Sequence, residues 1–460
     1  MNMFKGKTVA IVGLSIEGLD SVTFFRSEGA KIWCCDRRTE KELGKAYTDL
    51  KSEVEGFQLG EYYLKGLDRF DYIVRTPGMM LRVPELVALR RYGKEITSLT
   101  KLFFSLCQAP ITGITGTKGK GTTSTLLAQM ISLDGKKVWL GGNVGMPLLS
   151  KVRHIKSTDS VVLELSSFQL EDMEASPHIA VVLKTTQEHL ANQDKMASNF
   201  HETRETYVEA KESIVRYQTA EDIAILNADD PTSSSFAAHT PARIMYFSRT
   251  DSSQAAFIEN HTVYARISGK PEKICSASDI KLRGEHNLDN IAAATLAAIS
   301  AGVSLTAIRK AARSFKGLEH RLELVRRVRK VLYVNDSFST VPETAIAALE
   351  SFTEPIILIA GGSEKGSDFT ELGTVIADRS VKVLIAIGKM TERIVTAARN
   401  AGYKGKIITG LPDMHEIVRT AELESASGDV VLLSPACASF DMFANYKERG
   451  KLFKHEVSLL

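Results

Sequence analysis

The sequence predicts an α/β protein of three domains: a Rossmann-like N-terminal domain, a central parallel-sheet domain of the P-loop ATPase type and a Rossmann-like C-terminal domain. The chain has 460 residues, which at about 150 residues per domain suggests about three domains. Apolar strand-like runs alternate with helical patterns along the whole sequence. Residues 111–130 show the order strand, glycine-rich loop and helix that a phosphate-binding loop needs. The domains are expected over residues 1–104, 105–315 and 316–460.

Composition excludes several classes of protein. A net charge of +3 is too small to indicate a protein that binds nucleic acid through its overall positive charge. No apolar run approaches the roughly 20 residues of a membrane span, and the N-terminus runs directly into a strand pattern instead of a signal peptide. The five cysteines lack CxxC spacing, as in a reduced protein. We therefore expect a cytoplasmic protein that binds neither nucleic acid nor membrane.

The N-terminal domain begins with a βαβ pattern. Residues 7–12 form an apolar strand, a tight turn and a helix follow, and a second strand ends at Asp36 and Arg37. The glycine pattern of the turn is partial, because Ser15 stands at its second glycine position. Asp36 either contacts a ribose hydroxyl or only ends its strand.

A later strand in the same domain runs directly into a turn. The strand covers residues 70–74, and Thr76, Pro77 and Gly78 follow shortly after it. Open α/β sheets bind ligands at the carboxyl ends of their strands. This turn is therefore a candidate binding element.

The central domain opens with the phosphate loop. Its glycines let backbone N–H groups converge on an oxyanion, and the following helix points its positive end at the same place. Lys120 would reach the β- and γ-phosphates. Gly121 stands where the usual pattern has Ser or Thr, so Thr122 or Thr123 must supply the metal contact; the alternative is a glycine-rich turn with a solvated lysine. The loop comprises Gly116, Thr117, Lys118, Gly119, Lys120, Gly121, Thr122 and Thr123.

Two further strands of the central domain carry or precede residues that could bind a metal ion. The strand 161–165 carries Glu164, and an acid at a strand end beside a phosphate loop is where a Mg²⁺ ligand belongs. His189 follows the strand 179–183 and is a candidate metal ligand or an ordinary histidine. Residues 194–217 form a long polar helix pattern whose Lys211, judged from the residues alone, is a solvated lysine.

The rest of the chain keeps the α/β pattern. Residues 243–282 indicate short strands and turns, and Asn287 and Asn290 then share one face near the start of an alanine-rich helix. In the C-terminal domain, four strands each end in polar or glycine residues, which predicts a ligand crevice at one rim of the sheet. These strands cover residues 330–334, 356–360, 383–387 and 430–433.

Several separated motifs together resemble the Mur ligases of peptidoglycan synthesis over nearly the whole chain. The phosphate loop alone would also fit the folylpolyglutamate synthetases, whereas LELSSFQL with SPACASFDMF is typical of the members that add D-glutamate. The shared motifs are ITGTKGKGTT, GGNVG, LELSSFQL, HN with Asn290, GLEHRLE, NDS with Thr340, GGSEKGSDF and LLSPACASFDMF.

The resemblance implies an ATP-dependent acid–amino-acid ligase of the cytoplasm, expected to be a monomer. In the family, ATP phosphorylates the carboxylate of UDP-MurNAc-L-alanine, and the amine of D-glutamate attacks the acyl phosphate to give an amide. ATP and one or two Mg²⁺ ions are the implied cofactors, and the partners are small molecules.

The resemblance also assigns residues. It implies catalytic roles for Lys120, Glu164, His189 and Lys211, with Thr122, Glu164, His189 and a carbamylated Lys211 at the metal. ATP would contact the phosphate loop together with Asn287, Asn290, Arg321 and Asp336. The substrates would contact Leu14, Ser15, Asp36, Arg37, Thr76, Pro77, Gly78, Asn143, Ser166, Thr340, Lys365, Ser439 and Tyr446.

The chain departs from the family pattern at Gly121, at Phe338 (where a lysine is common after Asn-Asp-Ser) and over residues 184–189. These departures leave open another amide ligase of the Mur and folylpolyglutamate type with a different acceptor or amino acid. A non-catalytic nucleotide-binding protein is a further alternative, although Lys120, Glu164 and Lys211 are all present. A nicotinamide dehydrogenase is suggested only by the N-terminal turn, where Ser15 breaks the pattern.

Overall fold

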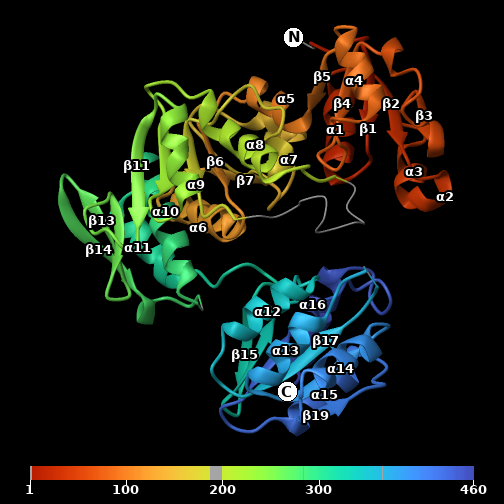
Figure 1. Cartoon of the computed structure of the whole chain (residues 1–460). Helices are drawn as coiled ribbons and strands as arrows, with labels where there is room; N and C mark the ends of the chain where they lie inside the picture. The colour runs from red at the N-terminus through yellow and green to blue at the C-terminus, as the bar shows by residue number, and fades with distance from the viewer. Residues whose placement is uncertain (1–2, 187–198, 283, 365) are drawn as a thin grey trace. The chain divides into compact units, whose positions relative to one another are not determined.

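The computed structural model describes residues 3–186, 199–282, 284–364 and 366–460. The chain divides into two compact units. The first contains Met1–Ile280 and Glu285–Ser314, and the second contains Lys281–Gly284 and Phe315–Leu460. The described residues form one sheet in the N-terminal part and one in the central part of the first unit, and a third in the second unit (Figure 1). The predicted α/β fold class is confirmed.

The N-terminal sheet is parallel, in the order β3-β2-β1-β4-β5. Alternate residues of β1 point to opposite faces: Val9 and Ile11 pack with α1, whereas Ala10 and Val12 pack with α4. The strands are β1 (Thr8–Val12), β2 (Lys31–Asp36), β3 (Gly56–Leu59), β4 (Tyr72–Arg75) and β5 (Ile96–Ser98). The helical segments are α1 (Ile16–Ser27), α2 (Glu40–Leu43), α3 (Lys45–Leu50), η1 (Gly60–Tyr62), η2 (Leu67–Arg69), α4 (Pro84–Arg91) and α5 (Leu99–Leu106).

The central sheet has the order β14-β13-β12-β11-β10-β9-β6-β8-β7, parallel from β12 to β7, with antiparallel β13 and β14 at one edge. Helix α6 packs with α10 and α11. The strands are β6 (Ile111–Thr115), β7 (Val138–Gly142), β8 (Ser160–Glu164), β9 (Ile179–Val182), β10 (Ile223–Asn227), β11 (Arg243–Ser248), β12 (Ala256–Glu259), β13 (Thr262–Ile267) and β14 (Lys270–Ser276). The helical segments are α6 (Lys120–Leu133), η3 (Leu149–His154), α7 (Ser167–Leu170), α8 (Arg204–Arg216), α9 (Pro231–Ser235), η4 (Phe236–His239), η5 (Ala277–Asp279), α10 (His286–Ser300) and α11 (Leu305–Ser314).

The helix expected over residues 194–217 is shorter than the sequence pattern suggested. Helix α8 begins at Arg204, because the Thr203 hydroxyl accepts a hydrogen bond from the backbone N–H of Thr206 and the two side chains complete a capping box. Residues 199–203 precede the helix, and residues 194–198 lie outside the described residues. The prediction of the helix start was therefore wrong.

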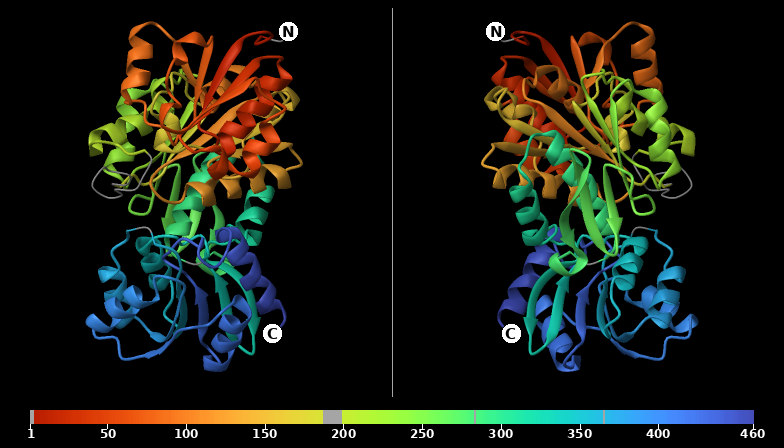
Figure 2. Two further views of the ribbon diagram at one scale, coloured as in Figure 1. Left: turned by 90° about the vertical axis from the view of Figure 1, so that its right-hand side faces the viewer. Right: turned by 90° about the vertical axis from the view of Figure 1, so that its left-hand side faces the viewer.

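The C-terminal sheet has the order β15-β16-β20-β17-β18-β19, and all neighbours except β15 and β16 are parallel. Helices cover both faces (Figure 2): one core joins the sheet to α12, α13 and α14, and the other joins it to α15 and α16. The strands are β15 (Glu323–Val328), β16 (Val331–Asn335), β17 (Ile356–Gly361), β18 (Val381–Ile387), β19 (Lys406–Ile408) and β20 (Val430–Leu433). The helices are α12 (Pro342–Glu350), α13 (Thr370–Asp378), α14 (Thr391–Asn400), α15 (Met414–Glu424) and α16 (Tyr446–Ser458).

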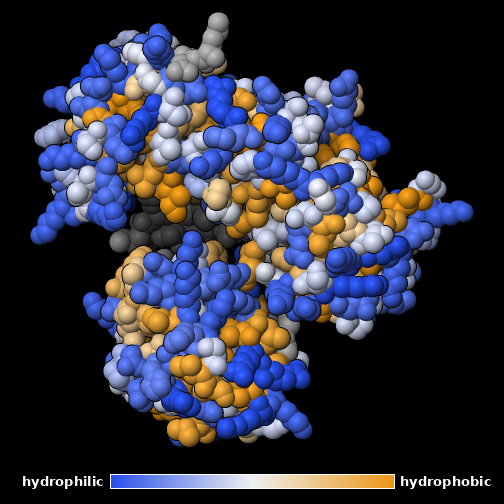
Figure 3. Space-filling model, turned by 180° about the vertical axis from the view of Figure 1, so that it is seen from behind, coloured by the Kyte–Doolittle hydropathy of each residue, from blue (hydrophilic) through white to orange (hydrophobic). Residues whose placement is uncertain are grey.

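The surface is mixed in character. Hydrophilic residues are spread among smaller hydrophobic patches on the face shown in Figure 3. Within the described part of the chain, no helix combines the length and the apolar character needed to cross a membrane.

Candidate functional site

The phosphate loop joins β6 to α6 in a backbone shape that requires glycine. Gly116 and Gly119 have φ of +141° and +89°, a range that residues with a Cβ rarely adopt. A Cβ on Gly119 would overlap the side-chain oxygen of Asn290 on α10. The loop therefore lies so close to α10 that only glycine fits at position 119 without a shift.

Replacing Gly119 with alanine is expected to weaken nucleotide binding by about tenfold or more, because the loop must move away from Asn290 and also carries an unfavourable φ. Titration with an ATP analogue would measure the change. Gly135→Ala is the matched control: Gly135 has φ +80° but open space where its Cβ would lie. Equal nucleotide affinity of the wild type and the Gly119 variant would contradict the role of this close contact.

Two lysines meet at the carbonyl oxygen of Gly116. Lys120 Nζ donates hydrogen bonds to the carbonyls of Gly116 (3.0 Å) and Thr117 (2.8 Å). Lys211 Nζ, from α8, donates to the same Gly116 carbonyl at 2.9 Å and to the Thr115 hydroxyl at 3.4 Å. Lys211 is only 1% exposed. The interpretation of Lys211 as a solvated lysine is therefore wrong, because its side chain lies beneath the loop.

The threonines of the loop have different surroundings. The Thr117 hydroxyl donates to the carbonyl of Thr186 (2.8 Å) and accepts from the Thr186 N–H, so the Tyr207 hydroxyl, 3.0 Å away, must be the donor to it. The Thr123 hydroxyl donates to Asn290 Oδ1 at 3.3 Å. Thr122 is thus the better candidate for a metal contact.

The two asparagines of α10 lie together, as their spacing predicted. Asn290 Nδ2 donates to Asn287 Oδ1 at 3.0 Å, and both residues are buried. Since Asn290 also contacts Gly119 and Thr123, this asparagine pair packs against the phosphate loop.

Glu164 lies beside the loop at the end of β8. Its strand pairs with β6, with Glu164 opposite Ile114. Glu164 is 5% exposed, and its Oε1 accepts a hydrogen bond from Asn143 Nδ2 at 3.4 Å. The described residues contain no group of three or more His, Cys, Asp or Glu side chains that could hold a metal ion. His189 lies outside the described residues.

The N-terminal turn is closed by Asp36. Its Oδ2 accepts from the backbone N–H of Leu14 (2.7 Å), and Arg38 donates to both carboxylate oxygens. Burial raises the pKa of Asp36, but the hydrogen bonds from Arg38 and Leu14 outweigh it and hold the pKa below its ordinary value. Asp36 therefore shapes the turn that presents Ser15, and a ribose contact stays a prediction.

The turn after β4 lies next to the N-terminal turn. The Thr76 hydroxyl donates to the Val12 carbonyl at 3.1 Å, and a Cβ on Gly13 would overlap the Thr76 side chain. The Pro77 carbonyl accepts from Asn199 of the central part at 2.8 Å. The structure thus brings Leu14, Ser15 and Asp36 together with the segment 76–78, whereas Arg37 is exposed beside them.

The second unit has its own cluster at the carboxyl ends of its strands. Asp336 accepts hydrogen bonds from the Leu322 N–H (3.0 Å) and the Ser434 hydroxyl (2.8 Å). The Arg321 guanidinium lies 5.9 Å from the ring centre of Phe338, which makes an edge contact with Tyr446. Ser439 is buried nearby in the chain segment before α16, Thr340 lies two residues beyond Phe338, and Lys365 lies outside the described residues.

Asp336 gives a testable pH dependence. Burial raises its pKa from 3.8 to about 7, although Ser434 and Leu322 act in the opposite direction. The free energy of unfolding should therefore fall as pH rises from about 4 to 7, because ionisation becomes easier in the unfolded chain than in the folded one. Asp336→Asn keeps the shape and removes this charge. The melting temperature of the variant relative to the wild type is expected to rise over that pH range, and a difference independent of pH would contradict the assignment.

Sequence reasoning missed several residues of these clusters. Tyr207 precedes Lys211 by four residues, so the helical spacing could have placed them on one face. Lys211 Nζ lies 4.7 Å from the Tyr207 ring centre. Arg449 is fully buried under the segment before α16, but its polar sequence neighbourhood gives no signal of burial.

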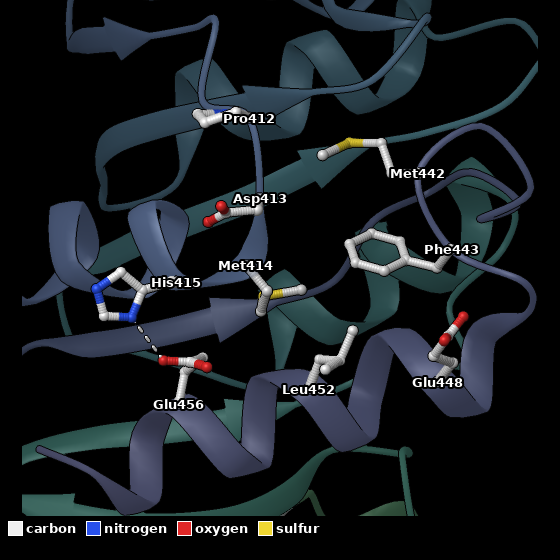
Figure 4. A pocket seen from close by; sticks show the side chains of 9 residues that line it. All are labelled: Pro412, Asp413, Met414, His415, Met442, Phe443, Glu448, Leu452 and Glu456. Atoms are coloured by element: carbon white, nitrogen blue, oxygen red, sulfur yellow. Dashed lines mark hydrogen bonds and ion pairs between the residues drawn. The ribbon is translucent and has the colours of Figure 1, made fainter.

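A pocket of about 270 Å³ lies elsewhere on the second unit, between the start of α15 and α16 (Figure 4). His415 and Glu456, at 2.8 Å, form one side of it. None of the site residues predicted from the sequence contributes to its walls. The lining residues are Pro412, Asp413, Met414, His415, Met442, Phe443, Glu448, Leu452 and Glu456.

Comparison with known protein families assigns the chain to one of them. Residues 7–98 match the Mur ligase MurD-like N-terminal domain, residues 114–298 the Mur ligase middle domain, and residues 320–437 the Mur ligase glutamate ligase domain. The chain belongs to the Mur ligase family, which confirms the resemblance of its motifs.

The more particular likeness is to one member of the family. The chain is 41% identical to the UDP-N-acetylmuramoylalanine–D-glutamate ligase of Acetivibrio thermocellus, over 99% of this chain and 97% of that protein. It is also 41% identical to the protein of the same name from Symbiobacterium thermophilum, over 98% of each.

Solved structures of the family share the fold. The UDP-N-acetylmuramate-alanine ligase MurC from Thermotoga maritima matches with a TM-score of 0.59 and 18% identity, over 98% of this chain and 99% of that one. A structure of MurF from Acinetobacter baumannii matches with a TM-score of 0.60 and 17% identity, over 86% and 92%.

Proposed function

We propose that this chain is a cytoplasmic, ATP-dependent amide ligase that joins D-glutamate to UDP-N-acetylmuramoyl-L-alanine, a step in peptidoglycan precursor synthesis. The observation that carries the proposal is the arrangement around Gly116. Two lysine side chains, Lys120 and Lys211, donate to one carbonyl of the phosphate loop, and Glu164 lies on the neighbouring strand. The names of the full-length relatives supply the substrate pair.

The chemistry needs this arrangement. A carboxylate is a poor electrophile, so its oxygen first takes the γ-phosphoryl group of ATP and releases ADP. The amine of the amino acid then attacks the acyl carbon and loses a proton, the C–O bond to phosphate breaks, and inorganic phosphate leaves to give the amide. Because the first transfer joins two anions, cationic groups at the site lower its barrier. Lys120, whose Nζ donates to the loop carbonyls of Gly116 and Thr117, is the cation proposed for the β- and γ-phosphates.

The donors around the loop fit Mg²⁺, which prefers oxygen ligands. Glu164 offers a buried carboxylate, and Thr122 offers a hydroxyl in the first turn of α6. The proposed holders of one or two Mg²⁺ ions are Thr122, Glu164, His189 and Lys211 as a carbamate. Bound Mg²⁺ would neutralise charge on the transferring phosphoryl group. This carbamate would form if the neutral Lys211 amine added to CO₂ and lost a proton.

The remaining predicted residues divide between the substrates. Of the residues that the resemblance assigns to ATP, the phosphate loop, Asn287 and Asn290 belong to the first unit, and Arg321 and Asp336 belong to the second. The UDP substrate is assigned to the N-terminal turns and to Asn143 and Ser166. D-Glutamate is assigned to Thr340, Lys365, Ser439 and Tyr446.

The deciding experiment is phosphate release from ATP and Mg²⁺ in the presence of UDP-MurNAc-L-alanine. D-Glutamate, L-glutamate and no amino acid are compared, and stimulation by D-glutamate alone is expected. Phe338 occupies a place in the second unit where the family commonly has lysine. Stimulation by a different amino acid, in a wider panel, would therefore favour the alternative of a family member with another substrate and would refute the D-glutamate assignment.

A further inference from the structure

Helix α1 connects the N-terminal turn to the central part of the first unit through acidic side chains. Glu17 Oε1 accepts a hydrogen bond from Gln169 Nε2 at 2.7 Å. Asp20 Oδ2 accepts from the Ser150 N–H at 3.0 Å, and Glu28 Oε1 accepts from Arg153 Nε at 3.0 Å. Glu17 stands in the first turn of α1, two residues after Ser15. It is thus the acid nearest in sequence to the proposed UDP-substrate turn.

The partner of Glu17 belongs to the segment that follows Glu164. Gln169 Oε1 accepts from both the backbone N–H (2.9 Å) and the hydroxyl (3.1 Å) of Ser166. These two donors fix the orientation of the Gln169 amide, so that its Nε2 faces Glu17. A continuous hydrogen-bonded path therefore runs from the first turn of α1 through Gln169 to Ser166.

The two carboxylate oxygens of Glu17 differ in their hydrogen bonding. Glu17 Oε2 is buried and has no hydrogen-bond partner within the described part of the chain. The charged groups that act on this carboxyl are Arg75, at the end of β4, and Asp20, on the same helix. Arg75 is itself engaged by Asp172 at 2.9 Å and by the carbonyls of Met79 and Phe168. Burial raises the pKa of Glu17 to about 7, although Gln169 and Arg75 lower it.

We propose that Glu17 is a positioning residue for the UDP substrate: through Gln169 it couples the turn at Leu14 and Ser15 to the segment carrying Glu164 and Ser166. This inference rests on the proposed function, in which both segments contact the UDP substrate. An ionised Glu17 close to the N-terminus of α1 opposes an incoming diphosphate, because both anions favour the same positive helix end. Substrate binding is accordingly strongest when Glu17 is protonated and weakens as pH rises through about 7.

The test compares wild type, Glu17→Ala, Glu17→Gln and Glu28→Gln. Calorimetric titration with UDP-MurNAc-L-alanine in the absence of ATP is made from pH 6 to 8.5, and KM values are measured for both substrates. At pH 6, where Glu17 is protonated, Glu17→Ala is expected to raise the Kd and KM of the UDP substrate about tenfold, with the KM of D-glutamate unchanged. Glu17→Gln keeps an acceptor for Gln169, so it should bind as the wild type does at pH 6 and lose the pH dependence.

Glu28→Gln is the matched control, because Glu28 is the C-cap residue of the same helix and accepts a hydrogen bond from Arg153. It is expected to leave both KM values and their pH dependence unchanged. An unchanged KM in an active Glu17→Ala enzyme would overturn the inference alone, as would a wild-type pH profile in Glu17→Gln or an equal loss in Glu28→Gln. A wild-type chain that binds no UDP-MurNAc-L-alanine would overturn the proposed function and this inference together.

Discussion

Replacing Lys211 with alanine is expected to lower kcat by about 10³-fold, the scale of losing one preorganised charge-stabilising group. Lys211 is buried, and its Nζ donates to the Gly116 carbonyl of the phosphate loop. Steady-state phosphate release measures the loss. Lys137→Ala, at an exposed lysine that pairs with Asp159 at 3.7 Å, is the control and should retain activity.

Chemical rescue separates two roles for Lys211. If the working form is a carbamate, acetate should restore part of the activity of the alanine variant, and removal of CO₂ should slow the wild type. If the working form is the unmodified amino group that donates to Gly116 and Thr115, a small amine should rescue and acetate should not. Rescue by amine alone would refute the carbamate, and an unimpaired alanine variant would refute any catalytic role.

Replacing Arg449 with methionine is expected to destabilise the second unit by about 3 kcal/mol, since several buried acceptors lose their donor at once. Arg449 donates to the Ser337 hydroxyl (3.0 Å) and to the carbonyls of Ser337 (2.9 Å), Cys437 (3.1 Å) and Ala438 (3.4 Å). Burial lowers the pKa of Arg449 to about 10, so the side chain remains cationic at neutral pH. Urea unfolding followed by circular dichroism would measure the effect.

Arg419→Met is the control for this change. Arg419 is half-exposed and forms a surface ion pair with Glu422 at 2.9 Å, an interaction that contributes at most about 1 kcal/mol. Equal stability losses in the two variants would contradict the special role of Arg449. Because Arg449 holds the segments around Ser337 and Cys437, its variant should also raise the KM of the amino acid.

Strand ends were the part of the site that could be predicted from the sequence. Each apolar run ends where polar or glycine residues begin, so the positions of Glu164, Asp336 and the phosphate loop followed from local pattern alone. The pairing of Asn287 with Asn290 followed from helical spacing.

Burial of polar side chains could not be predicted in the same way. Lys211 and Arg449 stand in polar helix sequences and look like surface residues, yet tertiary neighbours enclose both. The role of Glu17 depends on Gln169, which is 152 residues away in the sequence. Such contacts are set by the packing of sheets and helices, which a local pattern does not encode.

The two units differ in their tryptophan content. Both tryptophans, Trp33 and Trp139, belong to the first unit: one is on β2 and the other on β7. Intrinsic tryptophan fluorescence should therefore report unfolding of the first unit alone, while circular dichroism reports both. A fluorescence transition that is unchanged in Arg449→Met beside a shifted dichroism transition would show that the units melt independently.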